Sequence, residues 1–235
     1  WVDSGTGSDG NPGTFTQPFS TLDYAFSKTT ASNGDIIFLF PGHAETVSVA
    51  AGIAQDVAGV AVIGGGQGAL RPTFTFTSAS VTPSWDITVP NSTVENIITI
   101  CNKDTHTAMF NVSAANVYLD FEHRDTSATV EADTVVLSTA AADQLTIKMT
   151  YLGFTAGDAC VTPIKLVGCN NGRINVDFYG KASTAVVNFI TTLSNNIHVT
   201  GRFYNSGTTD FSKNVVDTIT GSIWTVVGYD ATAGK

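Results

Sequence analysis

The sequence has little charge and no long apolar run, and each shortage argues against a class of protein. Charged residues make up 13% of the 235 residues, and the eleven Lys and Arg residues form no cluster. Direct binding to a nucleic-acid backbone is not expected, because it needs a basic surface. No run of eighteen apolar residues occurs, so no membrane span is expected either.

Cysteine is also scarce. Cys101, Cys160 and Cys169 are too few and too scattered for a disulfide framework or a zinc site, so they are expected to be buried thiols. The sequence opens at Trp1 with neither a Met nor a signal-peptide pattern, and Trp1 is expected to be a processed or first-ordered residue.

The residues that are present favour β structure. Apolar residues reach 43%, which predicts a folded chain. Thr, Val and Ile are abundant, and β-branched side chains suit a pleated sheet. The formal net charge of −9 is spread thinly, so Thr, Ser, Asn and Gly must cover most of the surface. The class is therefore mainly β.

Two short apolar strand patterns recur together five times in the C-terminal two thirds of the chain. The first strand of each pair starts at Phe110, Val135, Ile164, Val187 and Val215, and the second at Val117, Leu145, Ile174, Ile197 and Ile223. Successive repeats lie twenty-three to twenty-nine residues apart, a period that indicates a repeat architecture. The pattern favours an all-β fold, a right-handed parallel β-helix, with a β-sandwich or jelly roll as the alternative.

One structural domain with three segments is expected. Residues 1–34 should form an irregular opening segment and a capping helix, residues 35–230 the solenoid, and residues 231–235 a tail. In the first segment, Ser20 is expected to cap a helix that runs to about Lys28.

Further strands are expected before the paired repeats, at residues 36–40, 46–49, 60–63 and 73–77. The first of them is a continuous apolar run, so it should be a buried strand. The last alternates Thr with Phe and should have one covered face.

Alternation within the second strands predicts which side chains face inward. Inward columns are expected at the strand starts and at positions two and four residues later, namely Leu119, Ile147, Val176, Val199 and Thr225, then Phe121, Met149, Phe178, Gly201 and Val227. The intervening residues should face outward, namely Tyr118, Thr146, Asn175, His198 and Trp224, then Asp120, Lys148, Asp177, Thr200 and Val226.

The last of these columns holds the one arrangement that resembles a catalytic pair. Asp120 and Asp177 would lie roughly 9.5 Å apart, near the upper separation for the two acids of an inverting glycosidase. Lys148 would lie between them and fill the space that a substrate needs. The favoured interpretation is therefore a structural ladder of alternating charge, and no catalytic residue is predicted.

Three further groups give weaker signals, namely His43 with Glu45, Asp3 with Asp9 and Asn11, and Gly64-Gly65-Gly66. The first pair is expected to be surface polar structure in a turn. The second group resembles half of a calcium loop but lacks the bidentate Glu, and the glycines lack the Lys and Ser/Thr of a phosphate loop. We predict no metal or cofactor site, while a catalytic triad assembled from distant residues stays open.

Part of the chain resembles a known family. The residues that carry the resemblance are 5–11, 17–25, 33–37, 41–46, 56–60, 63–66 and 71–74. They resemble the opening of right-handed β-helix proteins of tailed bacteriophages, in particular those that decorate virions. Similar openings occur in pectate-lyase-like proteins, surface adhesins and phage tailspikes. The resemblance implies a short helix that plugs the first coil, followed by a solenoid that commonly assembles as a trimer.

This resemblance implies a non-enzymatic virion protein on the capsid surface, a decoration or cement protein that forms a homotrimer. Its partner would be the major capsid protein or another virion protein, and Tyr118, Trp224 and Val226 would be covered by neighbouring subunits. Tailspike depolymerases are usually longer and carry several acids on one outer sheet. The alternatives are a small tailspike or fibre domain that binds or cleaves host polysaccharide, as a hydrolase or lyase, and a bacterial surface adhesin.

Overall fold

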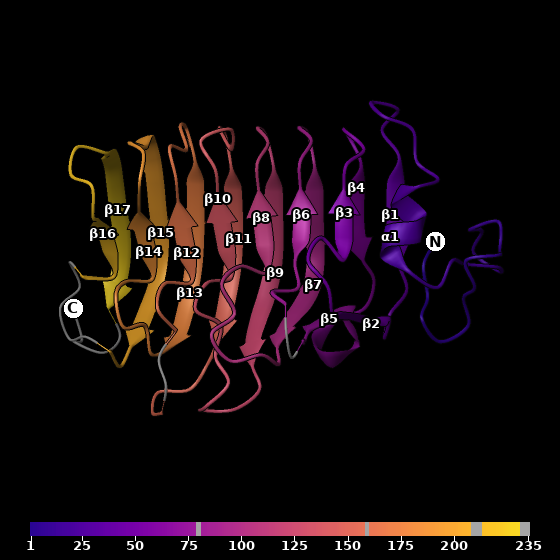
Figure 1. The fold of residues 1–235 in the computed structure, drawn as a ribbon, viewed down its shortest axis with the longest axis horizontal. Coiled ribbons are helices and arrows are strands. Elements are labelled where there is room, and N and C mark those ends of the chain that lie inside the picture. Colours follow the sequence, from indigo (N-terminus) through magenta and orange to yellow (C-terminus); the bar gives the residue numbers. More distant parts are fainter. Residues whose placement is uncertain (79–80, 158–159, 208–212, 231–235) are drawn as a thin grey trace.

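The chain forms a parallel β-helix in the computed structural model, which describes residues 1–78, 81–157, 160–207 and 213–230. Figure 1 shows the coils stacked in sequence order, from helix α1 (Leu22–Phe26) at one end to β17 at the other. The larger sheet contains β1 (Ile36–Leu39), β2 (Ala44–Val47), β4 (Ala61–Gly64), β5 (Thr73–Phe76), β7 (Thr93–Cys101), β9 (Tyr118–Asp125), β11 (Thr146–Leu152), β13 (Arg173–Gly180), β15 (Asn195–Asn205) and β17 (Ile223–Asp230). The smaller sheet contains β3 (Ile53–Gln55), β6 (Trp85–Ile87), β8 (Phe110–Val112), β10 (Val136–Ser138), β12 (Ile164–Leu166), β14 (Val187–Phe189) and β16 (Val215–Asp217).

The pairing of these strands decides between the two predicted architectures. Each strand pairs in parallel with its counterparts in neighbouring coils. A sandwich would need antiparallel hairpins, so the β-helix prediction is confirmed. The ten predicted strand starts of the paired repeats fall within two residues of the observed ones, whereas β3 was missed. Among the described residues, no helix is long and apolar enough to cross a membrane.

The N-terminal helix closes the first coil, but its cap differs from the predicted one. Thr21, not Ser20, is the N-cap, and its side chain accepts a hydrogen bond from the Tyr24 amide. The Ser20 amide instead donates to the carboxylate of Asp9, as does the Thr21 amide. The regular helix also ends at Phe26, short of the predicted Lys28.

The helix also covers the exposed end of the smaller sheet. The carboxylate of Asp23 accepts a hydrogen bond from the amide of Ala54, which lies in the terminal strand β3. On the larger sheet, Val2 hydrogen-bonds to the backbone of Phe38 and Phe40 beside β1. These contacts satisfy backbone groups that an open sheet edge would expose. The boundary predicted at residue 34 lies just before β1, and the predicted tail, 231–235, lies outside the described residues.

Strand β1 corrects the prediction of a buried strand at residues 36–40. It alternates, and Ile36 is 67% exposed while Ile37 and Leu39 are buried. The outward side stays apolar because Phe38 packs against the ring of Trp1, with centroids 4.9 Å apart. A continuous apolar run here reflects an aromatic cluster on the outer surface, which Phe15 and Phe40 complete.

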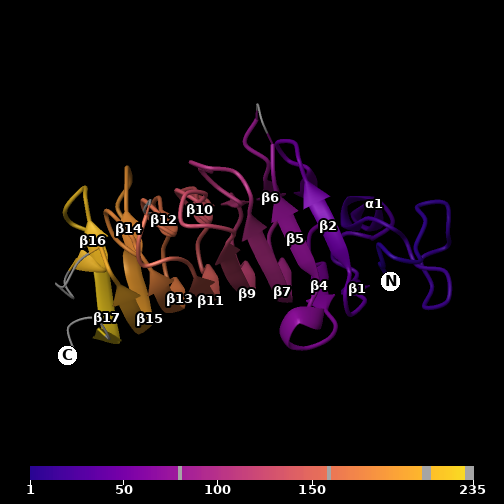
Figure 2. The ribbon, with the colours of Figure 1, turned by 90° about the horizontal axis from the view of Figure 1, so that it is seen from below.

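The larger sheet changes character along the solenoid. In the first coils it is split into two short strands, β1 and β2 in one coil and β4 and β5 in the next, and we call these the bent coils. Strand β7 joins both halves, since β4 pairs with its start and β5 with its end. From β9 to β15 each coil has one long strand, and we call these the straight coils. Figure 2 shows the 3-10 turn (Gly68–Leu70) projecting from the corner beside β4.

The bend depends on one left-handed residue in β7. Asn96 has φ 58° and bulges between the part of β7 that pairs with β4 and the part that pairs with β5. Its side-chain amide donates to the carbonyls of Gly64, at 2.8 Å, and Gly66, at 3.1 Å. Asn tolerates positive φ better than most residues, which suits this position. The prediction that Gly64-Gly65-Gly66 is a turn holds only after Gly64, which is the last residue of β4, and Asn96 binds the carbonyls on both sides of this point.

The other corners also use residues with positive φ. Asn91, Asn116 and Asn171 come just before β7, β9 and β13, and Asn196 is the second residue of β15, all with φ between 55° and 60°. Their side chains join neighbouring coils: the Asn116 amide donates to Asn91 at 2.6 Å, and the Asn196 amide to Asn171 at 2.8 Å. These bonds hold the coils in register at one edge.

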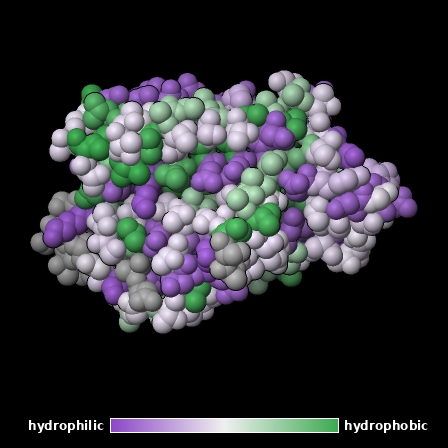
Figure 3. Space-filling model, viewed as in Figure 1, coloured by the Kyte–Doolittle hydropathy of each residue, from purple (hydrophilic) through white to green (hydrophobic). Residues whose placement is uncertain are grey.

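The interior is filled by stacked apolar side chains, many of them aromatic. Trp85 lies between Phe74 and Phe110, with ring centroids 5.2 and 5.4 Å away, and Phe110 also contacts Phe121. Aromatic pairs at this separation contribute about 0.5–1.5 kcal/mol beyond burial. On the face drawn in Figure 3, hydrophobic and polar residues are interspersed over the outside of this core.

The structure corrects the predicted columns after β11. Leu119 pairs with Ile147 as predicted, but Ile147 pairs with Ile174 rather than Val176. The shift of two residues preserves which face each side chain occupies, so Val176 remains buried. A period-2 pattern cannot detect such a shift, because both registers give the same inward and outward faces.

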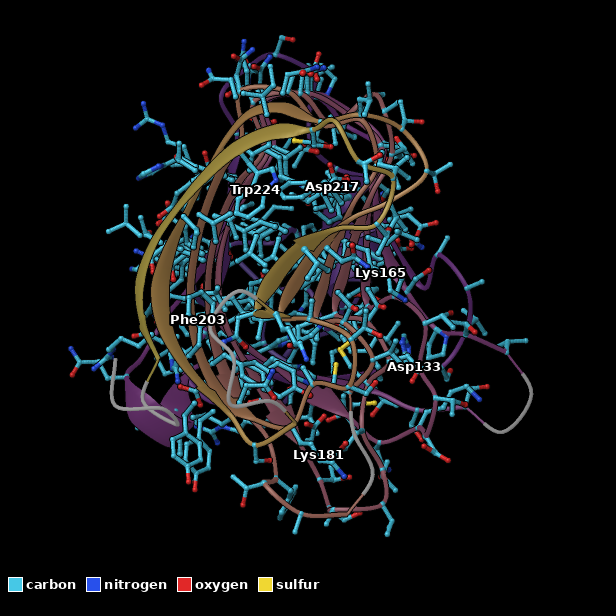
Figure 4. All side chains as sticks on the ribbon, turned by 90° about the vertical axis from the view of Figure 1, so that its left-hand side faces the viewer. Asp133, Lys165, Lys181, Phe203, Asp217 and Trp224 are labelled. Atoms are coloured by element: carbon cyan, nitrogen blue, oxygen red, sulfur yellow. The ribbon has the colours of Figure 1, made fainter. Side chains whose placement is uncertain are left out.

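In β17 the predicted faces are reversed. The register between β15 and β17 shifts at Asn195 and Ile197, so that Ile197 pairs with Trp224 instead of Ile223. One extra residue exchanges the two faces of a strand. Trp224 and Val226, predicted to face outward, pack against the core, and Figure 4 shows Trp224 inside the coil. The residues predicted to face inward, Ile223, Thr225 and Val227, are exposed.

Candidate binding surface

The outer face of the straight coils brings side chains from four strands into register. Its rows, read from β9 to β15, are Tyr118, Thr146, Arg173 and His198; Asp120, Lys148, Asn175 and Thr200; Glu122, Thr150, Asp177 and Arg202; and Arg124, Leu152, Tyr179 and Tyr204. The first two rows are mostly polar, and a hollow of about 250 Å³ lies among them. The last two rows combine ion pairs with aromatic rings.

Of the predicted ladder of Asp120, Lys148 and Asp177, the structure confirms the contact of Lys148 with Asp120 but not the one with Asp177. Lys148 Nζ donates to Asp120 Oδ2 at 2.7 Å, and this hydrogen bond raises the pKa of Lys148. Asp177, however, lies opposite Thr150 because of the two-residue shift in register. The two aspartates therefore occupy different rows, and the spacing predicted for a pair of catalytic acids does not apply.

Asp177 pairs with Arg202 on the next coil. Arg202 Nε donates to Asp177 Oδ1 at 3.2 Å and Nη2 donates to Oδ2 at 2.5 Å, a two-pronged arrangement. These hydrogen bonds lower the pKa of Asp177. The carboxylate is thus ionised at neutral pH and unsuited to donate a proton as a general acid.

A second ion cluster joins the bent and straight coils. Arg71, in the loop between β4 and β5, donates from Nη2 to Glu122 Oε2 at 2.6 Å, and Arg124 Nε donates to Glu122 Oε1 at 2.5 Å. Burial alone would raise the pKa of Glu122, but the hydrogen bonds and charges of the two arginines outweigh it and lower that pKa. The sequence prediction missed this cluster, since Arg71 and Glu122 lie in different coils.

A shallow groove of about 420 Å³ crosses β11, β13 and β15. Its outward side chains are Thr150, Leu152, Asp177, Tyr179, Arg202 and Tyr204. The Tyr179 and Tyr204 rings are stacked, with centroids 4.9 Å apart and planes inclined by 17°. Both remain accessible, Tyr179 at 49% and Tyr204 at 37%. The sequence prediction missed this pair because its columns ended at Phe178 and Gly201, before either tyrosine.

The interior holds a polar network below this face. Thr99 Oγ1 lies 3.0 Å from His123 Nδ1, and His123 Nε2 lies 3.2 Å from Asp125 Oδ1. Tyr151 donates to Asp125 Oδ2 at 2.6 Å, and burial raises the pKa of Tyr151 well above its usual value, so it remains a donor.

A hydroxyl, an imidazole and a carboxylate in this order have the chemical types of a catalytic triad. Thr99 and His123 are fully buried, however, and Asp125 is 9% exposed. A substrate cannot reach the Thr99 hydroxyl in this arrangement, so the network is structural. Its signal was in the sequence: His123 and Asp125 follow Phe121 at alternate positions on the inward face.

His43 and Glu45 form an internal joint, which corrects the prediction of surface polar structure in a turn. His43 is fully buried; its Nδ1 accepts a hydrogen bond from the Ser4 amide, and its Nε2 lies 3.2 Å from Glu45 Oε2. With Nδ1 accepting, the proton of a neutral ring is on Nε2, facing the carboxylate. Glu45 also accepts from the Leu22 amide, so the joint fastens the helix to β2.

The acidic residues of the opening segment bind backbone and hydroxyl groups. Asp3 accepts from the Gly5 amide and the Thr6 hydroxyl, while Asp9 accepts from Ser20 and Thr21. Asn11 donates to the carbonyl of Pro18. These bonds shape the turns and the helix start. Within the described ranges, no three His, Cys, Asp or Glu side chains are placed to hold a metal ion.

The three cysteines are free and buried, as predicted. Burial raises the pKa of the Cys101 thiol to about 12 and that of Cys169 to about 11, and it raises the pKa of Cys160 well above its usual value. Reactive cysteines need a lowered pKa and solvent access. These thiols therefore act as core side chains.

Comparisons with known proteins add one structural relative. No protein-family model and no curated protein match the chain. Among solved structures, the chain is similar to a rhamnogalacturonan lyase, with a TM-score of 0.64 and 16% sequence identity. The similarity shows the fold alone. The alignment covers 100% of this chain and 63% of the lyase chain, so this chain spans less than two thirds of that protein.

Proposed function

We propose that the protein is a non-enzymatic structural protein of a virion, a capsid decoration protein that acts as a homotrimer. The observation that carries the proposal is the cation pairing on the outer face of the straight coils. Asp120, Glu122 and Asp177 each bind a Lys or Arg. Carboxylates held in this way brace neighbouring coils, and a general acid would need a raised pKa instead.

The virion location rests on the resemblance of residues 5–76 to phage decoration proteins. The architecture is consistent with a bracing role, because the core continues from Val2 to Val215 and a helix closes one end. Trp224 and Val226 are not available as subunit contacts, since they pack against the core. Exposed apolar residues between β11 and β17 include Leu152, Tyr179, Tyr204, Ile223 and Val227.

Two measurements test this role. Sedimentation equilibrium at micromolar concentration should give a mass about three times that of the 24.6 kDa chain. The purified protein should then co-sediment with capsids of the phage whose genome encodes it, up to a saturating number of copies per particle. A monomer that stays in the supernatant at every capsid concentration would contradict the proposal.

The rival function is a tailspike or fibre domain that cleaves host polysaccharide. The shared fold with a polysaccharide lyase is the observation that favours testing it. The rival predicts release of reducing ends or unsaturated products, and loss of that release in Asp120→Asn or Asp177→Asn. The same two substitutions should leave capsid binding in place if the carboxylates only brace the coils.

A further inference from the structure

The groove across β11, β13 and β15 has a composition that neither the core nor the bracing role requires. Two stacked tyrosines and Leu152 form one side, and the Asp177–Arg202 pair lies beside them in the adjacent row. We propose that this groove binds an uncharged glycan. This inference goes beyond the decoration role and holds whether or not the protein binds a capsid.

The aromatic side of the groove suits the apolar face of a sugar. A pyranose ring exposes C–H groups on its faces, and the negative face of an aromatic ring attracts such weakly positive hydrogens. The rings of Tyr179 and Tyr204 are apolar surfaces that are partly exposed to solvent. Leu152, which is 41% exposed, extends the apolar surface to a third coil. Tyr179 and Tyr204 stack on each other, so at most one face of each ring is left for a sugar, and Leu152 lies next to Tyr179 in the same row.

The polar side of the groove suits hydroxyl groups. The guanidinium of Arg202 has about five N–H donors and uses two of them on Asp177. Its side chain is 73% exposed, so the remaining donors face solvent at the groove. Thr150 adds a hydroxyl in the same row. A fixed pair of a donor group and an acceptor group is the arrangement that orients neutral hydroxyls.

The charges favour an uncharged ligand over an acidic one. Arg202 is already neutralised by Asp177, so the groove offers no free cation from that pair to a uronic acid or sulfate. Two nearby cations are paired too: Arg124, in the row of the tyrosines, with Glu122, and Lys148, in the row on the other side of Asp177, with Asp120. The chain as a whole carries a formal charge of −9, which repels a polyanion at low salt. The volume, about 420 Å³, lies in the range of roughly 300–1,000 Å³ usual for small-molecule sites.

The test is calorimetric titration with neutral hexasaccharides of glucose, mannose and galactose, and with a hexasaccharide of galacturonic acid as the acidic probe. At least one neutral probe should bind more than tenfold more tightly than the acidic one. Tyr179→Ala should weaken that binding by at least tenfold, whereas Tyr179→Phe, which keeps the ring, should stay within threefold. Tyr118→Ala is the matched control, because Tyr118 lies on the same face in the row farthest from the groove.

Circular dichroism and thermal melting must show that each variant is folded as the parent. Failure of every neutral probe to bind would overturn the proposal, as would binding that Tyr179→Ala leaves unchanged or that prefers the acidic probe. If Tyr179→Ala instead dissociates an oligomer and no glycan binds, a second copy of the chain occupies the groove. Co-sedimentation of Tyr179→Ala with capsids tests the decoration role separately. That assay measures capsid binding alone, whereas the titration measures glycan binding alone.

Discussion

The bent and the straight coils share one repeat, yet the groove with its stacked tyrosines lies on the straight coils. In the bent coils the long strand is split in two, at residues 40–43 in the first coil and after Gly64 in the next, where Asn96 binds the glycines and the 3-10 turn projects. In the straight coils, long unbroken strands keep register, and ion pairs and tyrosines from different coils meet. The groove therefore lies where each coil has one long strand and successive strands pair without a shift in register, from β11 to β15.

The largest effect is expected at the bend. A Cβ on Gly64 would lie 2.2 Å from the carbonyl oxygen of Asn96, so Gly64→Ala must move backbone. We expect a loss of about 2–3 kcal/mol in the free energy of unfolding. Gly10→Ala is the control, because its Cβ would meet nothing closer than Ser8 Oγ at 3.7 Å. Equal stability of the two variants in denaturant unfolding would show that the corner is not tightly packed.

The next effect is expected inside the straight coils. Tyr151→Phe removes the hydroxyl that donates to Asp125 and leaves a buried carboxylate oxygen without it. The cost should be about 1–3 kcal/mol. Tyr179→Phe makes the same chemical change on the exposed side of the sheet and should cost less than about 0.5 kcal/mol. Thermal and denaturant unfolding measure both, and similar losses would mean that the interior network does not contribute as the geometry implies.

The smallest effect is expected at the junction between the two regions. Glu122 has a lowered pKa in the folded protein, because Arg71 and Arg124 outweigh the effect of burial. A carboxyl whose pKa is lowered by folding stabilises the folded protein at pH values above its ordinary pKa of 4.5. That stabilisation is lost as the pH falls through the pKa of the folded state. Glu122→Gln should therefore be less stable than the parent by about 1 kcal/mol at neutral pH.

The difference between Glu122→Gln and the parent should shrink as the pH falls below about 4.5. Unfolding midpoints across this range, at low and high salt, provide the measurement. A constant difference at every pH would indicate that Glu122 acts by packing and not by charge.

The sequence predicted the solenoid because strand starts such as Phe110, Ile164 and Val187 recur with nearly constant spacing. It also predicted the contact of Lys148 with Asp120, which depends on only two neighbouring coils. The predicted alignment of later strands was wrong by two residues, because a shift of two residues leaves the alternation of inward and outward faces unchanged. This is why Asp177 was assigned to Lys148 although it binds Arg202.

Bulges were the second source of error. The shift near Asn196 exchanges the inward and outward faces of β17. The sequence around Trp224 does not reveal it, because apolar residues there occupy both the inward and the outward positions of the alternation. The buried joint of His43 with Glu45 was missed for a different reason. Its partners, Ser4 and Leu22, lie far away in the sequence and are brought together only by the folded opening segment.

If the outer face of the straight coils binds glycans without cleaving them, as proposed above, no cleavage product should form. The most direct test is to incubate the purified protein with a panel of neutral and acidic polysaccharides and to measure reducing ends and the ultraviolet absorbance of unsaturated products. We expect no product above a buffer blank, even where binding is detected. Steady product release that Asp177→Asn or Asp120→Asn abolishes would contradict it and would make the protein an enzyme.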